Sequence, residues 1–515
     1  MRRIIFPKSL LPLLHSRAII SGQIHDPFVA GNILESLLRA YPSAHFQAHA
    51  LLSFSPHHST FMYNTLLHAY LCNNLPTHAI LLFYEMLLHG TTPNNHTFPL
   101  VLKAFSQAPQ YKNGAFIHTM ILKRRLDSDS YVHASLIHFY GAAGCIVEAR
   151  RVFDEKQLPG ISAWTALLSG YAKNGNLSMA WELFVRMPDR NLVSWSAMIS
   201  GYVQCRKPEK ALALFQEMMK SKVRPNCSVL VNVLVAAAEV GALQVGKWVH
   251  MYLEKNCMCL SSNLKTSLVH MYARCGDLLS AKQTFRRFRD KNVDLWNAII
   301  TGIGLYGRGE EAFELFVNMS DDGIPPDDMT FIGLLSACSH SGMVAEGRKC
   351  FEAMSKIYRI EPKLEHYSCM VDLLAKAGLV NEMVQLIQTM PMEPNARIWG
   401  SLFSSCRILG DITSGEIVGK QLIQLEPRNS GCYVQLANLY ASSGRWQEAV
   451  AVRDIMKRRG VVLEPGCSLI EVDGMVHEFL VGDKTHPKAN EICCVLDVMA
   501  RSLRVEGYVL NNSVS

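Results

Sequence analysis

Three glycines in the middle of the chain have the spacing of a phosphate-binding loop. The stretch "WNAIITGIGLYGRGEEAFELF", residues 296–316, places Gly302, Gly304 and Gly307 in G-x-G-x-x-G order before an amphipathic segment. Such glycines let a backbone approach a pyrophosphate, and a helix N-terminus favours the charge of that group. A glycine fingerprint alone is weak evidence, because the nucleotide site also needs a βαβ unit around it. The surrounding elements therefore decide whether this chemistry is present.

Cysteine and histidine spacing gives little support for a metal or nucleophile site. The chain has 15 cysteines, of which Cys257 and Cys259 are two apart and Cys493 and Cys494 are adjacent, and no C-x-x-C pair occurs. A paired-cysteine zinc site is therefore not expected, and free thiols in a reducing compartment are favoured. No spacing supports a Ser-His-Asp triad. Several histidines are better interpreted as packed or surface residues, among them His250, His340 and His366.

Composition limits the class of protein further. The chain of 515 residues is 49% hydrophobic and 18% charged, which indicates several domains or a long repeat array rather than disorder. Its net charge of +7 permits a polyanionic partner without requiring one. No run of 18 apolar residues occurs, so no transmembrane helix is expected. The basic N-terminus, with Arg2, Arg3, Lys8 and Arg17, fits either an organellar transit segment or a basic first helix.

An internal repeat answers the question raised by the glycines. Four segments share one pattern, namely "FMYNTLLHAY", "SAWTALLSGY", "VSWSAMISGY" and "DLWNAIITGI", and their aromatic anchors are Tyr63, Trp164, Trp195 and Trp296. The anchors recur at intervals of 101, 31 and 101 residues, and the downstream "LFYEM", "LFVRM", "LFQEM" and "LFVNM" segments recur at the same intervals. Weaker copies near Thr97 and Tyr131 divide the long interval into 35, 35 and 31 residues. Such periods are typical of a repeat architecture.

Each repeat is predicted to be a pair of helices. Apolar residues recur at helical spacing in both halves of a unit, and glycines and prolines fall between and after them. Gly302 then occupies the place of Gly170 and Gly201 inside a first helix, and Gly307 and Gly309 belong to the turn that follows. Gly304 has no counterpart by this comparison, so no phosphate loop recurs. We therefore reject a dinucleotide site and predict an all-α solenoid of helix-turn-helix repeats.

The alternation of 35, 35 or 36, and 31 or 32 residues resembles the plant pentatricopeptide repeat proteins of the PLS subclass. After residue 395, "ARIWGSLFSSCRILGDITSGEIVGKQLIQLEPRN" and "SGCYVQLANLYASSGRWQEAVAVRDIMKRRGV" are similar to the two E motifs of that subclass. The segment "PGCSLIEVDGMVHEFLVGDKTHPKANEI" looks like its E+ extension. The resemblance implies a right-handed α-solenoid superhelix. Its expected parts are an N-terminal segment with a degenerate partial repeat (1–59), an array of about ten repeats (60–395), E motifs (396–464) and an E+ extension (465–515).

Proteins of this subclass select cytidines in organellar transcripts for conversion to uridine. Many end in a DYW deaminase domain with H-x-E and C-x-x-C zinc ligands, but here Glu478 follows His477 directly and the sequence ends soon after "EGYVL". The resemblance therefore implies a non-enzymatic factor without a cofactor. It would bind single-stranded organellar RNA and recruit a DYW-type cytidine deaminase in trans, together with other editing-complex proteins. The expected compartment is the mitochondrion, with the chloroplast as the alternative. A protein-binding scaffold and another organellar RNA-processing or stability factor remain the competing interpretations.

In this family the fifth and last residues of a repeat select one base. Carried over to this sequence, the decodable pairs are Asn64 with Asn94 (pyrimidine), Thr165 with Asn191 (adenine), Ser196 with Asn226 (adenine, weaker), Thr266 with Asn292 (adenine), Asn297 with Asp327 (uridine) and Ser368 with Asn395 (purine, weaker). Four pairs stay undecoded: Pro99 with Asp129, Ala134 with Gly160, Val231 with Ser261, and Ile332 with Lys363. Phe61 and Val193 fit the apolar second position, whereas Asp294 and Asn263 do not. For any single pair, Thr or Asn could instead cap a helix.

Overall fold

The computed structural model describes residues 26–41, 44–54, 58–108, 114–258, 260–463, 467–472, 475–480 and 486–505. The candidate transit segment, with its four basic residues, lies outside this part of the chain. Contacts divide the molecule into two compact units, residues 1–232 and 233–515, and the boundary falls within α14 (Cys227–Val240).

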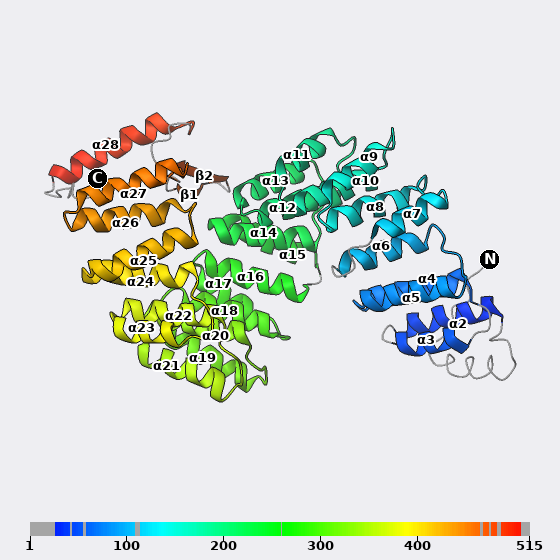
Figure 1. Ribbon diagram of the computed structural model, residues 1–515, viewed down its shortest axis with the longest axis horizontal. Coiled ribbons are helices and arrows are strands. Elements are labelled where there is room, and N and C mark those ends of the chain that lie inside the picture. The colour runs from blue at the N-terminus through cyan, green and yellow to red at the C-terminus, as the bar shows by residue number, and fades with distance from the viewer. Residues whose placement is uncertain are drawn as a thin grey trace. The chain divides into compact units, whose positions relative to one another are not determined.

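Helical hairpins build both units (Figure 1). The first unit contains α2 (Pro27–Ala40), α3 (His45–Phe54), α4 (Thr60–Cys72), α5 (Pro76–Leu88), α6 (Thr97–Gln107), α7 (Gly114–Lys123), α8 (Ser130–Ala142), α9 (Ile146–Asp154), α10 (Ile161–Lys173), α11 (Leu177–Arg186), α12 (Leu192–Gln204) and α13 (Pro208–Lys220). The second contains α15 (Leu243–Lys255), α16 (Ser262–Arg274), α17 (Leu278–Arg287), α18 (Val293–Gly304), α19 (Gly309–Asp321), α20 (Asp328–Ser341), α21 (Val344–Lys356), α22 (Leu364–Lys376), α23 (Val380–Thr389), α24 (Ala396–Leu409), α25 (Ile412–Leu425), α26 (Ser430–Ser442), α27 (Trp446–Arg458), strands β1 (Cys467–Val472) and β2 (Met475–Leu480), and α28 (Ala489–Val505). The predicted all-α solenoid of stacked hairpins is confirmed.

First helices of consecutive hairpins pack side by side through very small residues. A Cβ added at Gly302 of α18 would lie 2.4 Å from the Cβ of Ala273 on α16, and one added at Gly304 would lie 2.5 Å from the Cβ of Ala337 on α20. The two glycines of the apparent phosphate motif are therefore helix-packing residues. Gly141 of α8 occupies the same place in its repeat as Gly304 and meets Gly170 of α10, so the prediction that Gly304 has no counterpart was wrong.

The third glycine of that motif serves a turn. Gly307 has φ +70° in the connection between α18 and α19, a conformation that glycine adopts without strain. Gly309, predicted in the turn, is instead the first residue of α19. Helices flank the motif on both sides, and within the described chain no strand lies next to it in sequence. The rejection of a dinucleotide site is therefore supported by the fold.

A small β-hairpin follows the last helical pair, an element that the sequence analysis did not predict. Strands β1 and β2 pair antiparallel, with Cys467 opposite Leu480 and Val472 opposite Met475. The Glu471 carboxylate of β1 accepts hydrogen bonds from the backbone amides of Gln244 (2.9 Å) and Val245 (3.2 Å) in the first turn of α15. A carboxylate is favourable at that helix end because it satisfies free amides and complements the helix dipole.

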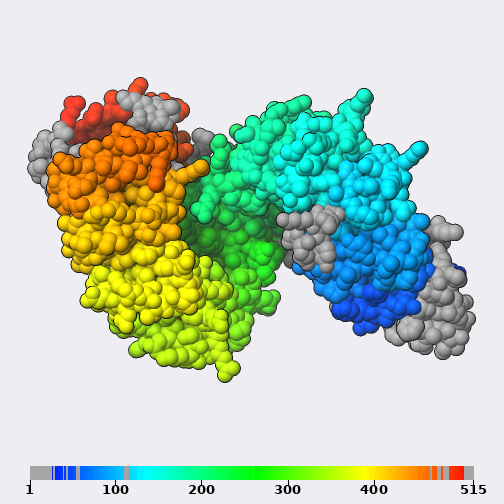
Figure 2. Space-filling view, viewed as in Figure 1, coloured from blue at the N-terminus to red at the C-terminus, as the bar shows by residue number. Residues whose placement is uncertain are grey.

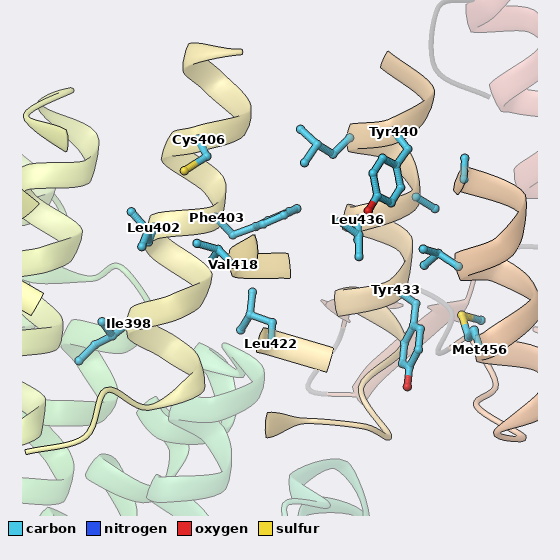
Figure 3. Close-up of a cluster of buried hydrophobic side chains, with 14 of the residues drawn as sticks. Ile398, Leu402, Phe403, Cys406, Val418, Leu422, Tyr433, Leu436, Tyr440 and Met456 are labelled. Atoms are coloured by element: carbon cyan, nitrogen blue, oxygen red, sulfur yellow. The ribbon is translucent and has the colours of Figure 1, made fainter. Parts of the chain in front are cut away.

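The hairpins from α22 to α27 share one apolar cluster. Its buried members include Leu402 and Phe403 of α24, Val418 of α25, Leu436 of α26 and Met456 of α27, and Figure 3 shows these side chains directed into the space between the helices. Figure 2 shows the hairpins from α22 to α27, yellow to orange, as adjoining layers. Among the described residues, no helix is both long enough and apolar enough to cross a membrane.

Candidate nucleic-acid interface

The residues predicted at the last position of each repeat lie at the start of the next first helix. In all six decodable units their side-chain Oδ1 atom accepts a hydrogen bond from a backbone amide of the first turn: Asn94 from Thr97, Asn191 from Ser194, Asn226 from Val229, Asn292 from Leu295, Asp327 from Thr330 and Asn395 from Ile398. The helix-capping interpretation is thus correct for these residues. Capping occupies one side-chain atom and fixes the group, which leaves the Asn Nδ2 or the Asp Oδ2 for another partner.

Asn297 and Asp327 form the most completely organised pair. Asn297 Nδ2 donates to Asp327 Oδ1 at 2.9 Å, and the amide of Thr330 donates to the same oxygen. The Thr330 hydroxyl lies 2.7 Å from Asn297 Oδ1 and 2.9 Å from Asp327 Oδ1, and it accepts from the amide of Asp327 to complete a capping box. These bonds hold both side chains in one orientation. One amide hydrogen of Asn297 and the Oδ2 atom of Asp327 are left outside the network.

Asn64 and Asn94 form an equivalent pair in the first unit. Asn64 Nδ2 donates to Asn94 Oδ1 at 3.2 Å, and that oxygen also accepts from His96 and Thr97. The Asn64 Oδ1 atom is buried and has no hydrogen-bond partner within the described residues. An unpaired buried acceptor of this kind costs about 1–3 kcal/mol.

The Asn64–Asn94 pair lines a cavity of about 810 Å³. Phe61, Asn64, Thr65, His68, Ala69 and Cys72 of α4 contribute one wall, and α2 and α6 supply others. These α4 residues hold positions two, five, six, nine, ten and thirteen of their repeat. The cavity therefore lies along the first-helix side of the hairpins, where the fifth-position residues were predicted.

The other four predicted pairs are not joined directly in the described part of the chain. Thr165 Oγ1 donates to its own helix, at carbonyls of Ile161 and Ser162, and Ser368 Oγ donates to Leu364 in the same way. Thr266 Oγ1 is buried without a partner in the described chain. Asn292 Nδ2 donates to Asp294 Oδ2 at 3.0 Å, so the acidic residue at the next wall position occupies that donor.

Exposed apolar side chains mark the second position of several repeats. Phe61 is 42% exposed and Val193 57% exposed, as expected of side chains that a base would cover. Tyr131 (74%) and Met329 (53%) occupy the same position and share this exposure, but the sequence analysis did not select them. Their register alone could have identified them, because each follows the first residue of its unit.

Two undecoded repeats have last residues with structural partners. Lys363 forms an ion pair with Asp328, which holds the pKa of the Asp328 carboxyl below its usual range. Asp129 accepts from Asn95 Nδ2 at 3.0 Å and from two amides of α8, and this bonding likewise lowers the pKa of the Asp129 carboxyl. The side chains of Lys363 and Asp129 are therefore both already bonded to residues of neighbouring hairpins.

The three histidines lie at packed or surface positions, as predicted. His366 is fully buried between Lys363 and Asp328 backbone groups, His250 Nδ1 lies 2.9 Å from the Tyr272 hydroxyl, and His340 is exposed. Burial lowers the pKa of His250. Among the described residues, no group of three or more His, Cys, Asp or Glu side chains could hold a metal ion, and Met218 and Met319 lie in the interior.

The structure defines an α-solenoid of helical hairpins whose first helices carry exposed apolar and paired polar side chains in register. Models of the PPR repeat family match residues 58–107, 190–229 and 291–340, and PPR repeat models match 162–192, 266–293, 329–357 and 365–393. The E motif matches 410–471 and the E+ motif 476–499. The chain belongs to the pentatricopeptide repeat family, in its PLS class with E and E+ motifs.

Curated relatives match along most of their length. From Arabidopsis thaliana, the pentatricopeptide repeat-containing protein At5g66520 is 38% identical over 97% of this chain and 81% of its own. The protein At2g22410, mitochondrial, is 38% identical over 97% of this chain and 89% of its own, and At1g08070, chloroplastic, is 34% identical over 98% and 82%. The crystal structure of the pentatricopeptide repeat protein PPR10 from maize, at 18% identity, covers 89% of this chain and 73% of its own with a TM-score of 0.41.

Proposed function

We propose that the protein is a sequence-specific single-stranded RNA-binding factor that selects cytidines for C-to-U editing in organellar transcripts, with a DYW-type deaminase supplied in trans. One observation carries this proposal. At Asn64–Asn94 and at Asn297–Asp327, the fifth-position amide donates to the last-position oxygen, and hydrogen-bonding groups of each pair are left over. A structural cap needs only the last residue, so the matched fifth residue is explained by recognition of a ligand.

The leftover groups differ between the two pairs, as base selection requires. Asn297 retains an N–H and Asp327 retains the Oδ2 acceptor, which complements the uracil edge with its N–H beside a carbonyl. In the first unit Asn64 also retains one N–H, but Asn94 presents the donor Nδ2 where Asp327 presents an acceptor. Two donors are suited to the carbonyl and ring-nitrogen acceptors of a pyrimidine edge. Each first helix would then address one base, with the exposed side chain at position two covering its face.

The same resemblance assigns roles to the parts of the chain. Repeats within 60–395 would bind the transcript, and the E motifs (396–464) and E+ extension (465–515) would dock the deaminase and other editing proteins. The relatives that carry chloroplastic or mitochondrial in their names support an organellar location, and the basic N-terminus fits an organellar transit segment. We propose the mitochondrion, with the chloroplast as the alternative.

Sequencing of organellar RNA from a plant that lacks this chain tests the proposal. Cytidines that stay unconverted should follow a site that reads, from 5′ to 3′, pyrimidine, two undecoded bases, adenine, purine, undecoded, adenine, uridine, undecoded, purine. Purified chain should also bind that single strand in a salt-dependent manner. Unchanged editing everywhere contradicts the editing role. Absence of RNA binding together with capture of peptides favours the protein scaffold instead.

A further inference from the structure

The cavity found at the first repeat has a counterpart in the hairpin α24–α25. This second cavity, of about 330 Å³, is lined by Arg397, Gly400, Ser401, Ser404, Ser405 and Ile408 of α24. Counted from Ala396, these residues hold positions two, five, six, nine, ten and thirteen. They are the same six positions through which α4 lines the cavity at Asn64. The base-binding surface of a repeat is therefore preserved in a hairpin assigned above to the docking region.

Neighbouring helices complete the two cavities in the same way. The preceding first helix contributes Glu35 and Leu38 of α2 at one site, and Asp372, Ala375 and Lys376 of α22 at the other. The following first helix contributes Leu100 of α6 and Gln435 of α26. Because α22 and α24 pack directly on each other, the α24 cavity adjoins the repeat that carries Ser368 and Asn395. A strand that follows the first helices would reach it next.

The chemistry of the α24 cavity favours a phosphate and its ribose. Lys376 Nζ lies 2.8 Å from Asp372 Oδ2 and donates to Ser339 at 3.0 Å, so these two charges compensate each other. Arg397 is exposed, and within the described residues no ion pair joins it to a carboxylate. One uncompensated guanidinium remains, beside the side chains of Ser401 and Ser404. Guanidinium and hydroxyl groups are suited to bind phosphate oxygens and sugar hydroxyls.

Base selection is missing from this cavity. Position five is Gly400, which has no side chain, whereas the decodable repeats carry Asn, Thr or Ser there. The matching last residue, Asn429, donates its Nδ2 to Glu426 at 2.7 Å and caps Gly431 through Oδ1. Neither selecting position offers a free group to a base edge. Any nucleotide in this cavity is held without discrimination.

The opposite face of α24 fixes the helix in place. Ile398, Leu402, Phe403 and Cys406 belong to the apolar cluster shared by the hairpins from α22 to α27 (Figure 3). Arg397, Gly400 and Ser401 therefore lie on a helix whose orientation is set by packing. The family matches given above stop at residue 393 and resume at 410, so this surface belongs to neither a repeat match nor the E motif match.

We propose that the hairpin α24–α25 binds one nucleotide of single-stranded RNA through its phosphate and ribose, without selecting the base, directly beyond the nucleotide addressed by Ser368 and Asn395. This inference rests on the proposed RNA-binding function. The hairpin would hold the strand between the sequence-reading repeats and the cytidine to be converted. It would thereby contribute affinity but no sequence preference.

Arg397→Ala in the full chain tests the phosphate contact. Two RNAs are compared, one that ends at the nucleotide of the Ser368 unit and one that extends a single nucleotide further; extensions at the 3′ and at the 5′ end are both measured. We expect wild type to bind the extended strand at the correct end about 3- to 10-fold more tightly, and the variant to bind both equally, with the salt slope reduced by roughly 0.7 for one lost phosphate contact. Arg407→Ala, an exposed arginine of the same helix outside the cavity, should behave as wild type.

Gly400→Asn tests the missing base selection by gain of function. No atom lies within 4 Å of a Cβ added at Gly400, so the helix accommodates the side chain. Wild type should bind all four bases at the extra position equally, and the variant should gain a preference of about 3-fold or more, since a carboxamide then faces the base. Equal affinities of wild-type protein for the short and extended RNAs would overturn the inference. A chain that binds no RNA at all would instead overturn the proposed function.

Discussion

The hairpins α4–α5 and α24–α25 have the same cavity geometry and different chemistry. Both line a cavity with six residues at identical positions of the first helix. At position five the first has Asn64, bonded to Asn94, and the second has Gly400; at position two they have Phe61 and Arg397. An apolar side chain at position two and a carboxamide at position five suit one particular base. A guanidinium at position two, with no side chain at position five, suits the phosphate of any nucleotide. The fold of a hairpin therefore fixes where a nucleotide would lie, and two side chains determine whether its base matters.

This separation follows from the two faces of a first helix. Buried residues such as Tyr63 and Leu67 in α4, or Leu402 and Phe403 in α24, hold the helix against its neighbours. In these two helices the residues at positions two and thirteen are exposed, and those at position five are only half-buried. Their replacement is expected to change binding while the stack of hairpins stays intact.

Of the changes considered, removal of residues 465–515 should have the largest effect on editing. RNA affinity should change very little. Editing should be abolished, because the deletion removes the β-hairpin and α28, whereas all predicted base-reading residues and the α24 cavity remain. Helices α24 to α27 keep their own apolar cluster, so circular dichroism should show folded protein. RNA affinity is measured by a binding titration and editing by conversion in complemented plants. A truncated chain that loses RNA binding would contradict the division of labour.

Much of the fold could be predicted because the same sequence pattern recurs in many repeats, so that each copy supports the assignment of the others. The recurrence of Trp164, Trp195 and Trp296 located the first helices, and Gly302 was correctly placed inside one. The β-hairpin was missed because two short strands give only a brief alternation, and "CSLIEV" and "MVHEFL" were included in a motif by resemblance. Gly304 was misjudged because Gly141, its counterpart, lies in a repeat whose aromatic anchor is absent.

The candidate site was only partly accessible from sequence. Register identifies Asn64, Asn94, Asn297 and Asp327, but the hydrogen bonds between them depend on how consecutive hairpins stack. Likewise, the hydrogen bond from Asn292 to Asp294 could be recognised only from the positions of the side chains. The α24 cavity was missed because Gly400 breaks the pattern of polar fifth residues, so no pairwise code points to it.

Exchange of the selecting pair in α18 should give the next largest effect. Asn297→Thr with Asp327→Asn reproduces the combination of Thr266 and Asn292, and preference at that nucleotide should move from uridine toward adenine by roughly 1–3 kcal/mol. Stability should change little, since the introduced asparagine still caps α20 and the introduced threonine can bond to its own helix as Thr165 does. Binding to four RNAs that differ at one base measures the shift. An unchanged preference in folded protein would point to Asp294 as the interfering wall residue.

Replacement of a glycine by alanine should have opposite effects on stability at the packing face and at the groove face of a first helix. Gly302→Ala places a Cβ 2.4 Å from that of Ala273 and should destabilise the second unit by about 1–3 kcal/mol, since the close-packed helices must move apart. Gly400→Ala meets no atom within 4 Å and should stabilise α24 by about 0.5–1 kcal/mol through the lower entropy of its unfolded chain. Hydrogen exchange of amides in α16, α18 and α24 measures both. Equal effects would show that the two faces are not distinct.

The smallest effect is expected where polar side chains connect consecutive second helices. At the first cavity-lining hairpin His49 of α3 lies 3.0 Å from Glu85 of α5, and at the α24–α25 hairpin Glu416 of α25 pairs with Lys420 of the same helix and with Arg445, each at 2.7 Å. Bonds from Lys420 and Arg445 lower the pKa of Glu416 to about 2. A lowered carboxyl pKa stabilises the fold fully above its unfolded value, about 4.3, and this contribution is lost as pH falls toward 2.

Because Lys420 is exposed and Arg445 only half-buried, Arg445→Gln should lower the unfolding temperature only slightly at pH 7. The difference in unfolding temperature from wild type should shrink steadily between pH 5 and about pH 2, since Arg445 is no longer attracted by Glu416 or by Glu448, 2.9 Å away, once they are protonated. Arg453→Gln, an exposed arginine of α27 outside this network, provides the control for loss of one charge. A destabilisation by Arg445→Gln that stays constant across the acidic range would show that Arg445 acts through its packing over the Tyr440 ring, at 4.7 Å, and not through these carboxylates.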